Sequence, residues 1–543
     1  MKKIAILLLL CLLVFPTSGR VLSKENINIR KTSFVMPGEI LSVSCSEAYP
    51  TLGQPVHLLI TLQGKAPERF NQTLTITDEF SGFVMTDGEM KWISGIVTIS
   101  QTSITIGKLP RYTRKIPWYP SVVGNHTFHM SVAASPEKEL NISVSFDVKG
   151  IITPSLGCPS VIIKNTSDQL LVTLSEERAI TEESCQVLQL QFDDIHSTSS
   201  YLLFNYTETV RSYVNAEKKV VEDDLILTYN TSSIPEGFYN LSVRTTKQNY
   251  SWPHAVKFLD AEPSEYTIVQ LSDIHIGKYS NFVNKKNELI RLLTYLNEQI
   301  HPDFVILSGD SIDWYNKKYK RNVYADLQEA LLTSQAPIYT TPGNHERYGN
   351  SLFFLYFPFT NLTPYHRFLN PLSDYSFSYG HVNYVFLDSG YDFSRWEIQP
   401  KIWLQSPEGS GLSAMQIHLL ETIWGDTQMN QIIVMHHPAV SNTNDSGWGA
   451  IPNNLPSGNN ECIGVNRAVF ITYCIENNVS VVLTGHTHEN LVLNYLGKEP
   501  NNVSAWPVFV QTDSATLSRQ NNGGRVVRIN QGAVESYEYE VFL

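Results

Sequence analysis

Cysteine, basic residues and long apolar runs are all scarce in this chain. Six of its 543 residues are cysteine, and no two of them have the Cys-x-x-Cys spacing of a cysteine metal site. Lys and Arg number 40 against 52 Asp and Glu, which gives a formal net charge of −12. Because nonspecific affinity for nucleic acid rests on basic side chains, this balance argues against a nucleic-acid-binding protein. The longest apolar run, at residues 4–15, is shorter than the roughly 20 residues that a membrane-spanning helix requires.

The N-terminus has the pattern of a secretory signal. Two lysines precede the apolar run, and small residues suited to cleavage follow it at Thr17, Ser18 and Gly19. We therefore expect residues 1–20 to be a signal peptide and the protein to be secreted or to act at the cell surface; an uncleaved signal anchor is the alternative. Asn-x-Ser/Thr acceptors, which mark surface positions of exported glycoproteins, support export. They occur at Asn71, Asn125, Asn141, Asn165, Asn205, Asn230, Asn240, Asn249, Asn361, Asn444, Asn478 and Asn502.

The first half of the chain has an all-β pattern. Between residues 21 and 262, short runs of alternating apolar and polar residues are separated by Gly, Pro, Asn and Asp clusters, which is typical of β-sandwiches. Residues 118–132 and 235–243 resemble the final hairpins of immunoglobulin-like units, and a break in the pattern follows each. We therefore predict two immunoglobulin-like β-sandwich domains, at residues 21–150 and 151–262.

The second half alternates between strand and helix patterns, which predicts an α/β domain at residues 263–543. Strands are expected at 266–271, 304–307, 337–341, 375–379, 382–387, 431–435, 479–484, 506–512, 525–529 and 534–540. Helices are expected at 287–300, 324–332, 412–424 and 465–475. In such domains ligands bind just beyond the carboxyl ends of the strands.

Five short motifs rich in metal-ligand side chains come where apolar, strand-like runs end. They are Asp273-Ile274-His275, Gly309-Asp310, Gly343-Asn344-His345-Glu346, His436-His437 and Gly485-His486-Thr487-His488. Together they supply enough carboxylate, amide and imidazole groups to bind two metal ions side by side. A two-metal site of this kind hydrolyses phosphate esters.

Spacing suggests how the first ligands divide between the ions. Asp310, at the end of a strand, is the candidate to bridge them. Asp273 and His275 are two residues apart on what we expect to be an extended stretch, so both can face one ion.

The remaining candidates come from the later motifs. His486 and His488 have the same spacing and can reach different ions, Asn344 offers a neutral oxygen, and His436 offers an imidazole nitrogen. His437 is the alternative to His436, because neighbours on a strand point to opposite faces. Mixed oxygen and nitrogen ligation suits transition-metal ions such as Zn, Mn or Fe better than Ca or Mg.

The expected chemistry needs no Ser or Cys nucleophile. Two cations about 3.5–4 Å apart acidify a bridging water, and the resulting metal-bound hydroxide attacks phosphorus in line with the leaving oxygen. His345 is the candidate catalytic residue, because it could protonate the leaving alkoxide or stabilise the charge of the transition state.

The five motifs resemble those of the calcineurin-like metallophosphoesterase superfamily, whose pattern is D-x-H, G-D, G-N-H-[ED], H and G-H-x-H. The resemblance extends over about residues 266–543 and implies a two-sheet β-sandwich core flanked by helices. It also implies two ligand sets and a catalytic residue: Asp273, His275, Asp310 and His488 for one metal, Asp310, Asn344, His436 and His486 for the other, and His345 for catalysis.

One position departs from a branch of this superfamily. Purple acid phosphatases have a Tyr ligand three residues after the bridging Asp, where this chain has Asp313. The motifs therefore look more like those of the cyclic-nucleotide phosphodiesterase and sphingomyelinase-like branches.

Several alternatives stay open. Glu346 and Arg347 either shape the phosphate pocket or form a surface salt bridge, and residues 441–462 form either a specificity loop or a surface insertion. His126 and His129 are an odd number of residues apart, so they are a poor metal pair. We expect an exported, two-metal phosphoesterase that favours phosphodiesters slightly over monoesters. The alternative is a cell-surface binding or adhesion protein with the phosphoesterase domain as a scaffold. In either case the β-sandwiches could bind a glycan, a cell surface or a protein.

Overall fold

The computed structural model describes most of the chain. It covers residues 39–542 except 64–69, 107–110, 133–135, 165, 167–168, 177–186, 215–219, 247, 278–284, 314–322, 353–354, 359–361, 391–410, 426–427, 441–462, 501–506 and 517–521. The described residues belong to one compact unit, Pro37–Leu543. The other unit, Met1–Met36, contains the expected signal peptide and lies outside the described residues, as does the loop at 441–462. No helix among the described residues combines the length and apolarity that a membrane crossing needs.

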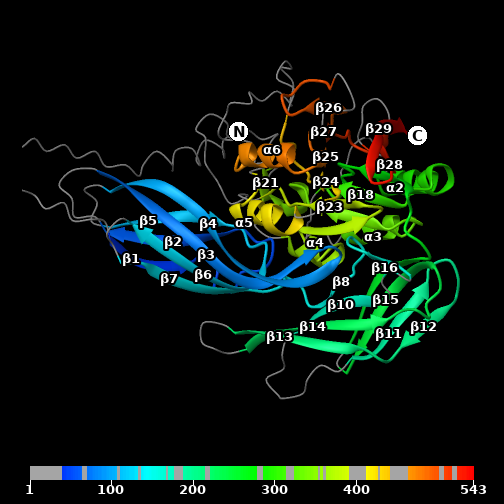
Figure 1. The fold of residues 1–543 in the computed structure, drawn as a ribbon, viewed down its shortest axis with the longest axis horizontal. Coiled ribbons are helices and arrows are strands. Elements are labelled where there is room, and N and C mark those ends of the chain that lie inside the picture. The colour runs from blue at the N-terminus through cyan, green and yellow to red at the C-terminus, as the bar shows by residue number, and fades with distance from the viewer. Residues whose placement is uncertain are drawn as a thin grey trace, which may run out of the picture. The chain divides into compact units, whose positions relative to one another are not determined.

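The N-terminal β region, residues 39–259, begins with two sheets (Figure 1). Their strand orders are β1-β2-β5 and β4-β3-β6-β7. The strands are β1 Glu39–Cys45, β2 Val56–Gln63, β3 Phe70–Thr86, β4 Glu89–Ile106, β5 Tyr112–Trp118, β6 Val123–Val132 and β7 Lys138–Val144. Buried and half-buried residues alternate along β2, as expected for a strand with one face on a core. Both sheets contribute to one apolar cluster that includes Leu58, Leu74 and Phe128.

Two further antiparallel-rich sheets complete the N-terminal β region. Their orders are β13-β14-β10-β8 and β12-β11-β15-β16-β9. The strands are β8 Gly150–Thr153, β9 Ser160–Ile163, β10 Gln169–Glu176, β11 Val187–Asp194, β12 Ser200–Leu203, β13 Thr207–Val214, β14 Val220–Asn230, β15 Gly237–Thr245 and β16 Asn249–Leu259. Leu170, Leu190 and Trp252 belong to the same apolar cluster, so these sheets also share a core. The expected all-β character of the N-terminal region is confirmed.

Both expected segments begin a hairpin. Within residues 118–132, β6 pairs with the next strand, β7, whereas β5 pairs with β2 in another sheet. The chain changes sheets between Trp118 and Val123, and Pro120 in this segment has no N–H with which to continue a ladder. Residues 235–243 begin the other hairpin, in which β15 pairs with β16.

The C-terminal part consists of two main sheets with helices on them. Their orders are β19-β18-β17-β28-β29 and β22-β23-β24-β25-β27-β26. The strands are β17 Glu265–Leu271, β18 Phe304–Ser308, β19 Ile338–Thr341, β22 Tyr375–Tyr379, β23 Val382–Phe386, β24 Asn430–Val434, β25 Val479–Thr484, β26 Leu491–Asn494, β27 Val508–Gln511, β28 Gly523–Asn530 and β29 Ala533–Val541. Ile306 of the first sheet and Tyr384 and Val434 of the second belong to one apolar cluster. The central strands of each sheet are parallel and almost fully buried, which explains their continuous apolar runs.

The helical and short elements connect these strands. They are α2 Lys285–Tyr295, a π-helical turn Leu296–Ile300, α3 Val323–Leu331, a 3-10 helix His345–Arg347, β20 Tyr348–Leu352, β21 Leu355–Pro358, α4 Thr363–Phe368, α5 Ala414–Leu419, a π-helical turn Leu420–Trp424 and α6 Arg467–Glu476. All expected strands and helices of this part are present, and their ends differ from the expected ones by no more than two residues. The strands β20, β21 and β26 and the helix α4 were not expected.

The N-terminal β region packs directly on the C-terminal part. Phe80 shares an apolar cluster with Met415 and Leu419 of α5. The indole Nε1 of Trp424 donates to the carbonyl oxygen of Met85 at 3.0 Å. These buried contacts explain why the two parts form one compact unit, while the expected domain boundaries at 150 and 262 stay predictions.

His126 and Asp78 form a buried pair inside the first two sheets. Nδ1 of His126 lies 2.9 Å from Oδ2 of Asp78, and Nε2 donates to the carbonyl oxygen of Val122 at 3.1 Å. His129 projects from the other face of β6 and is partly exposed beside Glu79. The two histidines thus face opposite sides, as expected, and serve packing instead of metal binding.

This pair makes stability depend on pH. Burial opposes charge on His126, but the Asp78 carboxylate raises its pKa above the usual value of about 6.5. The pair therefore stabilises the fold fully below that pH, and its contribution is lost as the pH rises through the folded-state pKa. We predict that His126→Gln lowers the free energy of unfolding by about 3–5 kcal/mol at pH 5.5, with a smaller loss at pH 9. Chemical denaturation at both pH values measures this. His129→Gln, at a surface pair, should cost less than about 1 kcal/mol; equal losses for the two variants would contradict the prediction.

Candidate metal centre

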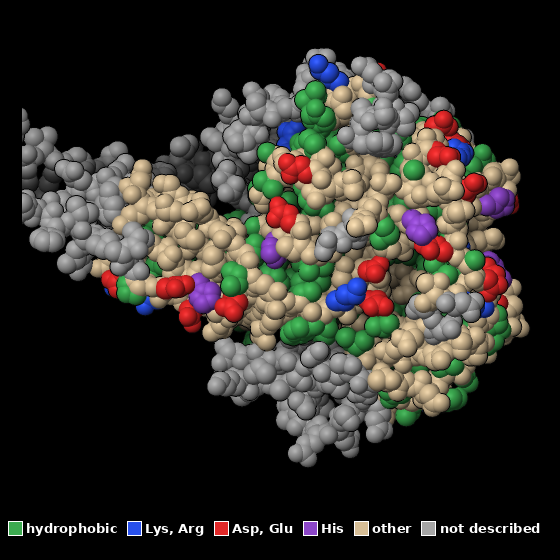
Figure 2. All heavy atoms as spheres, viewed as in Figure 1, with side chains coloured by type: hydrophobic (Ala, Val, Ile, Leu, Met, Phe, Trp, Pro, Cys, Tyr) green, Lys and Arg blue, Asp and Glu red, His purple; other side chains and the backbone are tan. Residues whose placement is uncertain are grey.

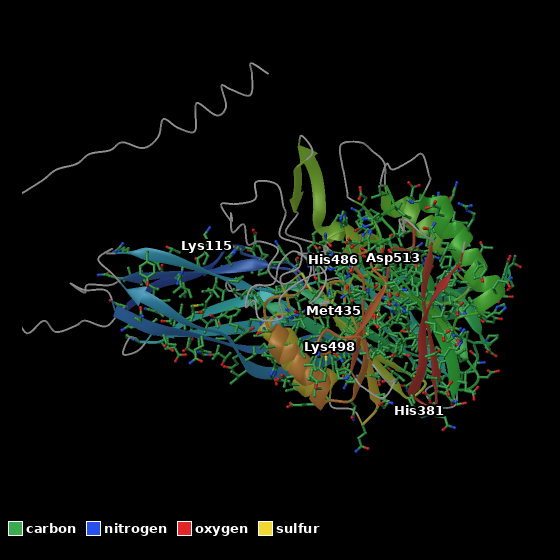
Figure 3. All side chains as sticks on the ribbon, turned by 90° about the horizontal axis from the view of Figure 1, so that it is seen from above. Lys115, His381, Met435, His486, Lys498 and Asp513 are labelled. Atoms are coloured by element: carbon green, nitrogen blue, oxygen red, sulfur yellow. The ribbon has the colours of Figure 1, made fainter. Side chains whose placement is uncertain are left out.

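The five motifs converge because each begins within two residues of the end of a strand. The strands are β17, β18 and β19 of the five-stranded sheet and β24 and β25 of the six-stranded sheet. Figure 3 labels residues at opposite ends of the second sheet: His381 directly precedes β23, and His486 follows the parallel strand β25. The site therefore lies where the carboxyl ends of both sets of parallel strands meet.

The ligand backbone is left-handed, and the expected extended stretch at 273–275 is wrong. Asp273 and His275 have φ angles of 53°, Asp310 has 52°, and His486 and His488 have 73° and 54°. Residues with a Cβ rarely adopt this conformation, at a cost of roughly 1–2 kcal/mol each, unless neighbouring groups hold them there. Backbone hydrogen bonds hold the first motif, from Asp273 N to Gly309 O at 3.2 Å and from His275 N to Asp310 O at 2.9 Å.

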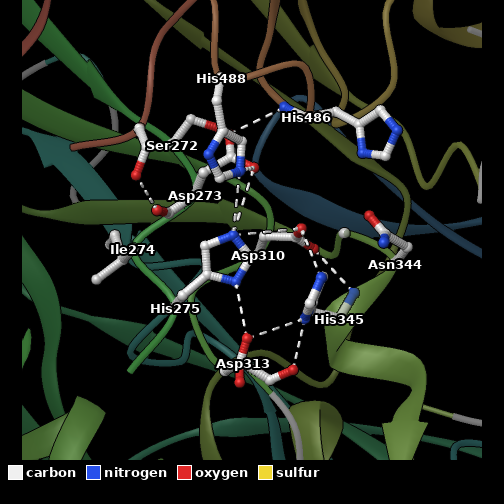
Figure 4. A network of polar contacts seen from close by, with 12 residues as sticks. Ser272, Asp273, Ile274, His275, Asp310, Asp313, Asn344, His345, His486 and His488 are labelled. Atoms are coloured by element: carbon white, nitrogen blue, oxygen red, sulfur yellow. Dashed lines mark hydrogen bonds and ion pairs between the residues drawn. The ribbon is translucent and has the colours of Figure 1, made fainter. Parts of the chain in front are cut away.

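The first group of candidate ligands contains Asp273, His275, Asp310 and His488 (Figure 4). Nε2 of His488 lies 3.3 Å from Oδ1 of Asp273 and 3.3 Å from Nε2 of His275. Nε2 of His275 lies 3.9 Å from Oδ2 of Asp310. Oδ1 of Asp273 is buried and accepts no hydrogen bond from any described residue. A cation would satisfy this oxygen, so the group fits a metal ion.

The second group contains Asp310, Asn344, His436 and His486. Nε2 of His436 lies 3.0 Å from Oδ1 of Asn344 and 3.2 Å from Oδ2 of Asp310. Nδ1 of His436 donates to the carbonyl oxygen of Ser308 at 2.8 Å, which turns Nε2 toward the other ligands. The ring of His486 lies 5.1 Å from that of His436, centre to centre. Asp310 is therefore close to ligands of both groups.

His437 takes a different position from His436. Its Nδ1 lies 2.7 Å from Oγ of Ser389, and its ring centre lies 4.5 Å from that of His486. Both histidines stay near the site because β24 ends at Val434, before the alternation of strand faces would separate them. His436 lies between Asn344 and Asp310, but His436, His437 and His486 also form a group that could hold a metal ion, so His437 stays the alternative ligand.

His345 lies at the rim of this centre. Its Nδ1 donates to the carbonyl oxygen of Asp313 at 2.5 Å, and its backbone N–H donates to Oδ1 of Asp310 at 2.8 Å. Oδ1 of Asp313 lies 3.5 Å from Nδ1 of His275 and 3.6 Å from Nδ1 of His345. Figure 4 shows Asp313 on one side of both rings. Asp313 thus contacts two imidazoles, and His275, Asp313 and His345 form a further group that could hold a metal ion.

Glu346 does not form the surface salt bridge considered for it. It is fully buried, and its carboxylate accepts backbone N–H groups of Gly343 at 2.7 Å, Asp310 at 2.9 Å, Ser311 at 2.8 Å and Ile312 at 3.3 Å. Burial and the Asp310 carboxylate raise the pKa of Glu346 to about 7. The backbone N–H groups act in the opposite direction and lower this pKa, because they favour the charged carboxylate. Glu346 ties the turn after β19 to the turn after β18 and so places Asp310.

The charges of the ligands suit a cation. Burial alone would raise the pKa of Asp310, but His436 and His345 hold the pKa well below its usual value. Burial and the nearby His345 lower the pKa of His275 to about 4, so this imidazole is neutral. Burial also opposes charge on His436, yet Asp310 raises the pKa of His436 to about 10. A metal ion that binds His436 must therefore displace a proton.

The loop after β27 is a part of the centre that the motifs did not reveal. Oγ of Ser514 donates to the carbonyl oxygen of Asp273 at 2.5 Å, and Oγ1 of Thr516 donates to that of Ile274 at 2.6 Å. The backbone N–H of Ala515 donates to Ser272 O at 2.9 Å. These bonds brace the left-handed turn of the first motif. The only signal in the sequence was a Ser- and Thr-rich segment directly after a predicted strand.

Residues 266–490 match the family model described as calcineurin-like phosphoesterase. The matched range contains the seven expected ligands and His345. No curated protein matches the chain at a significant level.

Several solved structures resemble about a fifth of the chain. The alkylpurine DNA glycosylase AlkC of Pseudomonas fluorescens is 14% identical over 20% of this chain and 30% of its own, with a TM-score of 0.15. A β-glucosidase from Listeria innocua is 8% identical over 20% of this chain and 16% of its own, also at 0.15. The sporulation control protein Spo0M of Bacillus subtilis is 12% identical over 20% of this chain and 50% of its own, at 0.14. The chain thus spans half or less of each of these proteins, and at such scores the likeness carries no argument.

The bracing loop yields a test by metal binding. We predict that Ser514→Ala weakens the affinity for Mn²⁺ or Zn²⁺ by about 10- to 100-fold, because such variants release the turn that carries Asp273 and His275. Isothermal titration calorimetry of the full chain measures the affinity. Ser413→Ala, which removes the hydroxyl that caps α5, is the matched control and should bind metal as the wild type does. Unchanged affinity in Ser514→Ala would show that the loop does not hold the ligands.

Proposed function

We propose that residues 266–490 form a calcineurin-like phosphoesterase domain and that the chain is a metal-dependent phosphoric ester hydrolase, which works with two metal ions held side by side. One observation carries the proposal. Oδ2 of Asp310 lies 3.2 Å from Nε2 of His436 and 3.9 Å from Nε2 of His275, so one carboxylate oxygen faces both groups of ligands. A carboxylate in that position is suited to bridge two cations.

We assign the ligands from the two groups described above. One ion would be held by Asp273, His275, Asp310 and His488, and the other by Asp310, Asn344, His436 and His486. The donor atoms are carboxylate oxygens, one amide oxygen and imidazole nitrogens, a set that suits Zn, Mn or Fe. When bound, such ions supply positive charge for the phosphate oxygens and lower the pKa of water.

His345 is placed to serve the leaving group. Since its Nδ1–H donates to the carbonyl oxygen of Asp313, its proton is fixed on that side of the ring when the imidazole is neutral. Nε2 then faces the centre, 3.8 Å from Oδ2 of Asp310, and its side chain is 17% exposed. From there a protonated His345 can donate to a leaving alkoxide. The hydrogen bond from its backbone N–H to Asp310 fixes the position of His345 relative to the ligands.

The charges around the centre support a slight preference for phosphodiesters. A monoester carries an additional negative charge, which extra cationic side chains would help to bind. Arg347 is the basic residue nearest to the third motif in sequence, but its guanidinium is buried against Asp388. On the face that Figure 2 shows, the described Lys and Arg side chains lie singly and form no basic patch. The net charge of −12 also favours small phosphate esters over a nucleic-acid polymer as substrates.

We also propose that the protein is an exported glycoprotein. Among the described residues, seven acceptor asparagines are exposed and one, Asn240, is half-buried. This distribution supports modification because a glycan needs a surface position. The exposed acceptors are Asn71, Asn125, Asn141, Asn205, Asn230, Asn249 and Asn478.

The paired sheets of the N-terminal β region support the proposal of two immunoglobulin-like sandwiches, at residues 21–150 and 151–262. Each pair of sheets shares an apolar core. Such sandwiches could bind a glycan, a cell surface or a protein partner. All seven ligands are present in the chain, so no observation favours the alternative of an inactive scaffold.

Turnover of model substrates tests the proposal. We predict that the full chain, supplied with Mn, Zn or Fe, hydrolyses bis(p-nitrophenyl) phosphate faster than p-nitrophenyl phosphate. Asp310→Ala should abolish turnover of both, because neither group of ligands is then complete. His345→Ala should lower kcat by about 10²- to 10⁴-fold while metal is still bound.

His381→Asn is the matched control. His381 is an exposed histidine with a positive φ, like the histidine ligands after β25, but it lies at the other end of the same sheet, away from the centre. It should retain wild-type turnover. Full activity of Asp310→Ala would exclude the assigned centre, and faster monoester turnover would overturn the diester preference.

A further inference from the structure

A buried polar network joins the N-terminal β region to the third motif. The hydroxyl of Tyr119 donates to Oδ2 of Asp388 at 2.6 Å, and Nη2 of Arg347 donates to the same oxygen. Nη1 of Arg347 donates to the carbonyl oxygen of Gly53 at 3.4 Å. Tyr119, Arg347 and Asp388 are at most 1% exposed. Two loops of the N-terminal β region, at Gly53 and Tyr119, thus contact the guanidinium of Arg347 directly or through Asp388.

These two loops are themselves connected. The backbone N–H of Gly53 donates to the carbonyl oxygen of Pro120 at 3.1 Å. Gly53 has a φ of 70°, and a Cβ at this position would lie 2.5 Å from Oγ of Ser373. The loop can therefore approach the phosphoesterase domain this closely only with glycine. Tyr119 and Pro120 lie in the segment where the chain changes sheets, which explains why a residue after β5 points away from its own sheet.

Arg347 leads from this network into the centre. It is the last residue of the 3-10 helix His345–Arg347, and its backbone N–H donates to the carbonyl oxygen of Asn344 at 3.1 Å. The same short turn carries the proposed ligand Asn344 and the proposed catalytic residue His345. Because one short turn links these three residues, a displacement of Arg347 would also move Asn344 and His345.

Asp388 is held as firmly on its other side. Its Oδ1 accepts the backbone N–H of Gly390 at 2.9 Å, and its own N–H donates to Oδ1 of Asp374 at 2.8 Å. Gln416 donates to Asp374 at 2.7 Å and to the carbonyl oxygen of Asp388 at 2.8 Å. These bonds fix the orientation of the Asp388 carboxylate. The hydroxyl of Tyr119 and the guanidinium of Arg347 then donate to the same oxygen, Oδ2, so the bond from Tyr119 affects the position of Arg347.

We propose that Tyr119 is a positioning residue for phosphoester hydrolysis, which acts through Asp388 and Arg347 on the turn that carries Asn344 and His345. The N-terminal β region is then a structural part of the catalytic unit and not only an attached binding module. This inference rests on the proposed function of the centre. It assigns to the N-terminal β region a role that its fold alone does not reveal.

The test removes a single hydroxyl. Tyr119→Phe in the full chain should lower kcat for bis(p-nitrophenyl) phosphate by about 10-fold and leave KM within about twofold, because misplacement of reacting groups affects the chemical step more than substrate binding. Tyr239→Phe is the matched control. Its hydroxyl is also in the N-terminal β region and donates to the carbonyl oxygen of Pro235 at 3.1 Å, without a contact to Arg347 or Asp388.

A second readout does not require turnover. The visible absorption of Co²⁺ bound to the full chain reports the geometry of its ligands. We expect the Co²⁺ spectrum of Tyr119→Phe to differ from that of the wild type, and the spectrum of Tyr239→Phe to match it. The double variant Tyr119→Phe/Asp388→Asn should lose no more kcat than the more damaging single variant, because both changes act through one network.

The outcomes separate the two proposals. A wild-type chain that neither binds Co²⁺ nor hydrolyses either ester would contradict the proposed function itself. If the wild type is active and Tyr119→Phe loses no more kcat than Tyr239→Phe, with an unchanged Co²⁺ spectrum, the positioning role of Tyr119 is overturned and the proposed function stands. Should Tyr119→Phe not fold, Asp388→Asn tests the same network from the phosphoesterase side with the same two readouts.

Discussion

The site depends on the position of one carboxylate, that of Asp310. Oδ2 of this residue faces His275 on one side and His436 on the other, and Oδ1 accepts the backbone N–H of His345. Its own backbone N–H is held by the buried carboxylate of Glu346. Since these bonds come from three different strand ends, the two sheets must meet in one register before Asp310 can face both groups of ligands. The chemistry of the centre therefore depends on how the two sheets pack.

The same constraint explains the unusual backbone at the ligands. Asp273, Asp310 and His486 adopt left-handed φ angles that ordinary strand ends do not require. Such residues are maintained because the surroundings supply bonds that an extended backbone could not make. The loop after β27 supplies some, through Ser514, and the carboxylate of Asp273 supplies another, to the backbone N–H of His486 at 2.9 Å. The bonds that offset this cost thus come from a large part of the C-terminal half, and the N-terminal β region contacts Arg347 directly after the third motif.

Much of this arrangement could be predicted from sequence, because it follows from strands that end together. Apolar runs located β17, β18, β24 and β25, and the polar residues directly after them identified the motifs. The left-handed turns could not be predicted, since Asp-x-His spacing is the same in an extended and a turned backbone. The role of Glu346 was also missed, because three of its four backbone partners are more than thirty residues away. The change of sheet after Trp118 could not be predicted either, because only the pairing of β5 with β2 reveals that β5 and β6 lie in different sheets.

Anomalous X-ray diffraction from crystals of the full chain grown with Mn²⁺ tests the central claim most directly. Data on both sides of the Mn absorption edge locate each bound ion without reference to activity. We predict two peaks about 3.5–4 Å apart, one on each side of the Asp310 carboxylate, with Asp273 beside the first and Asn344 beside the second. A single peak, or two peaks that do not share Asp310, would contradict the two-metal centre proposed for this protein.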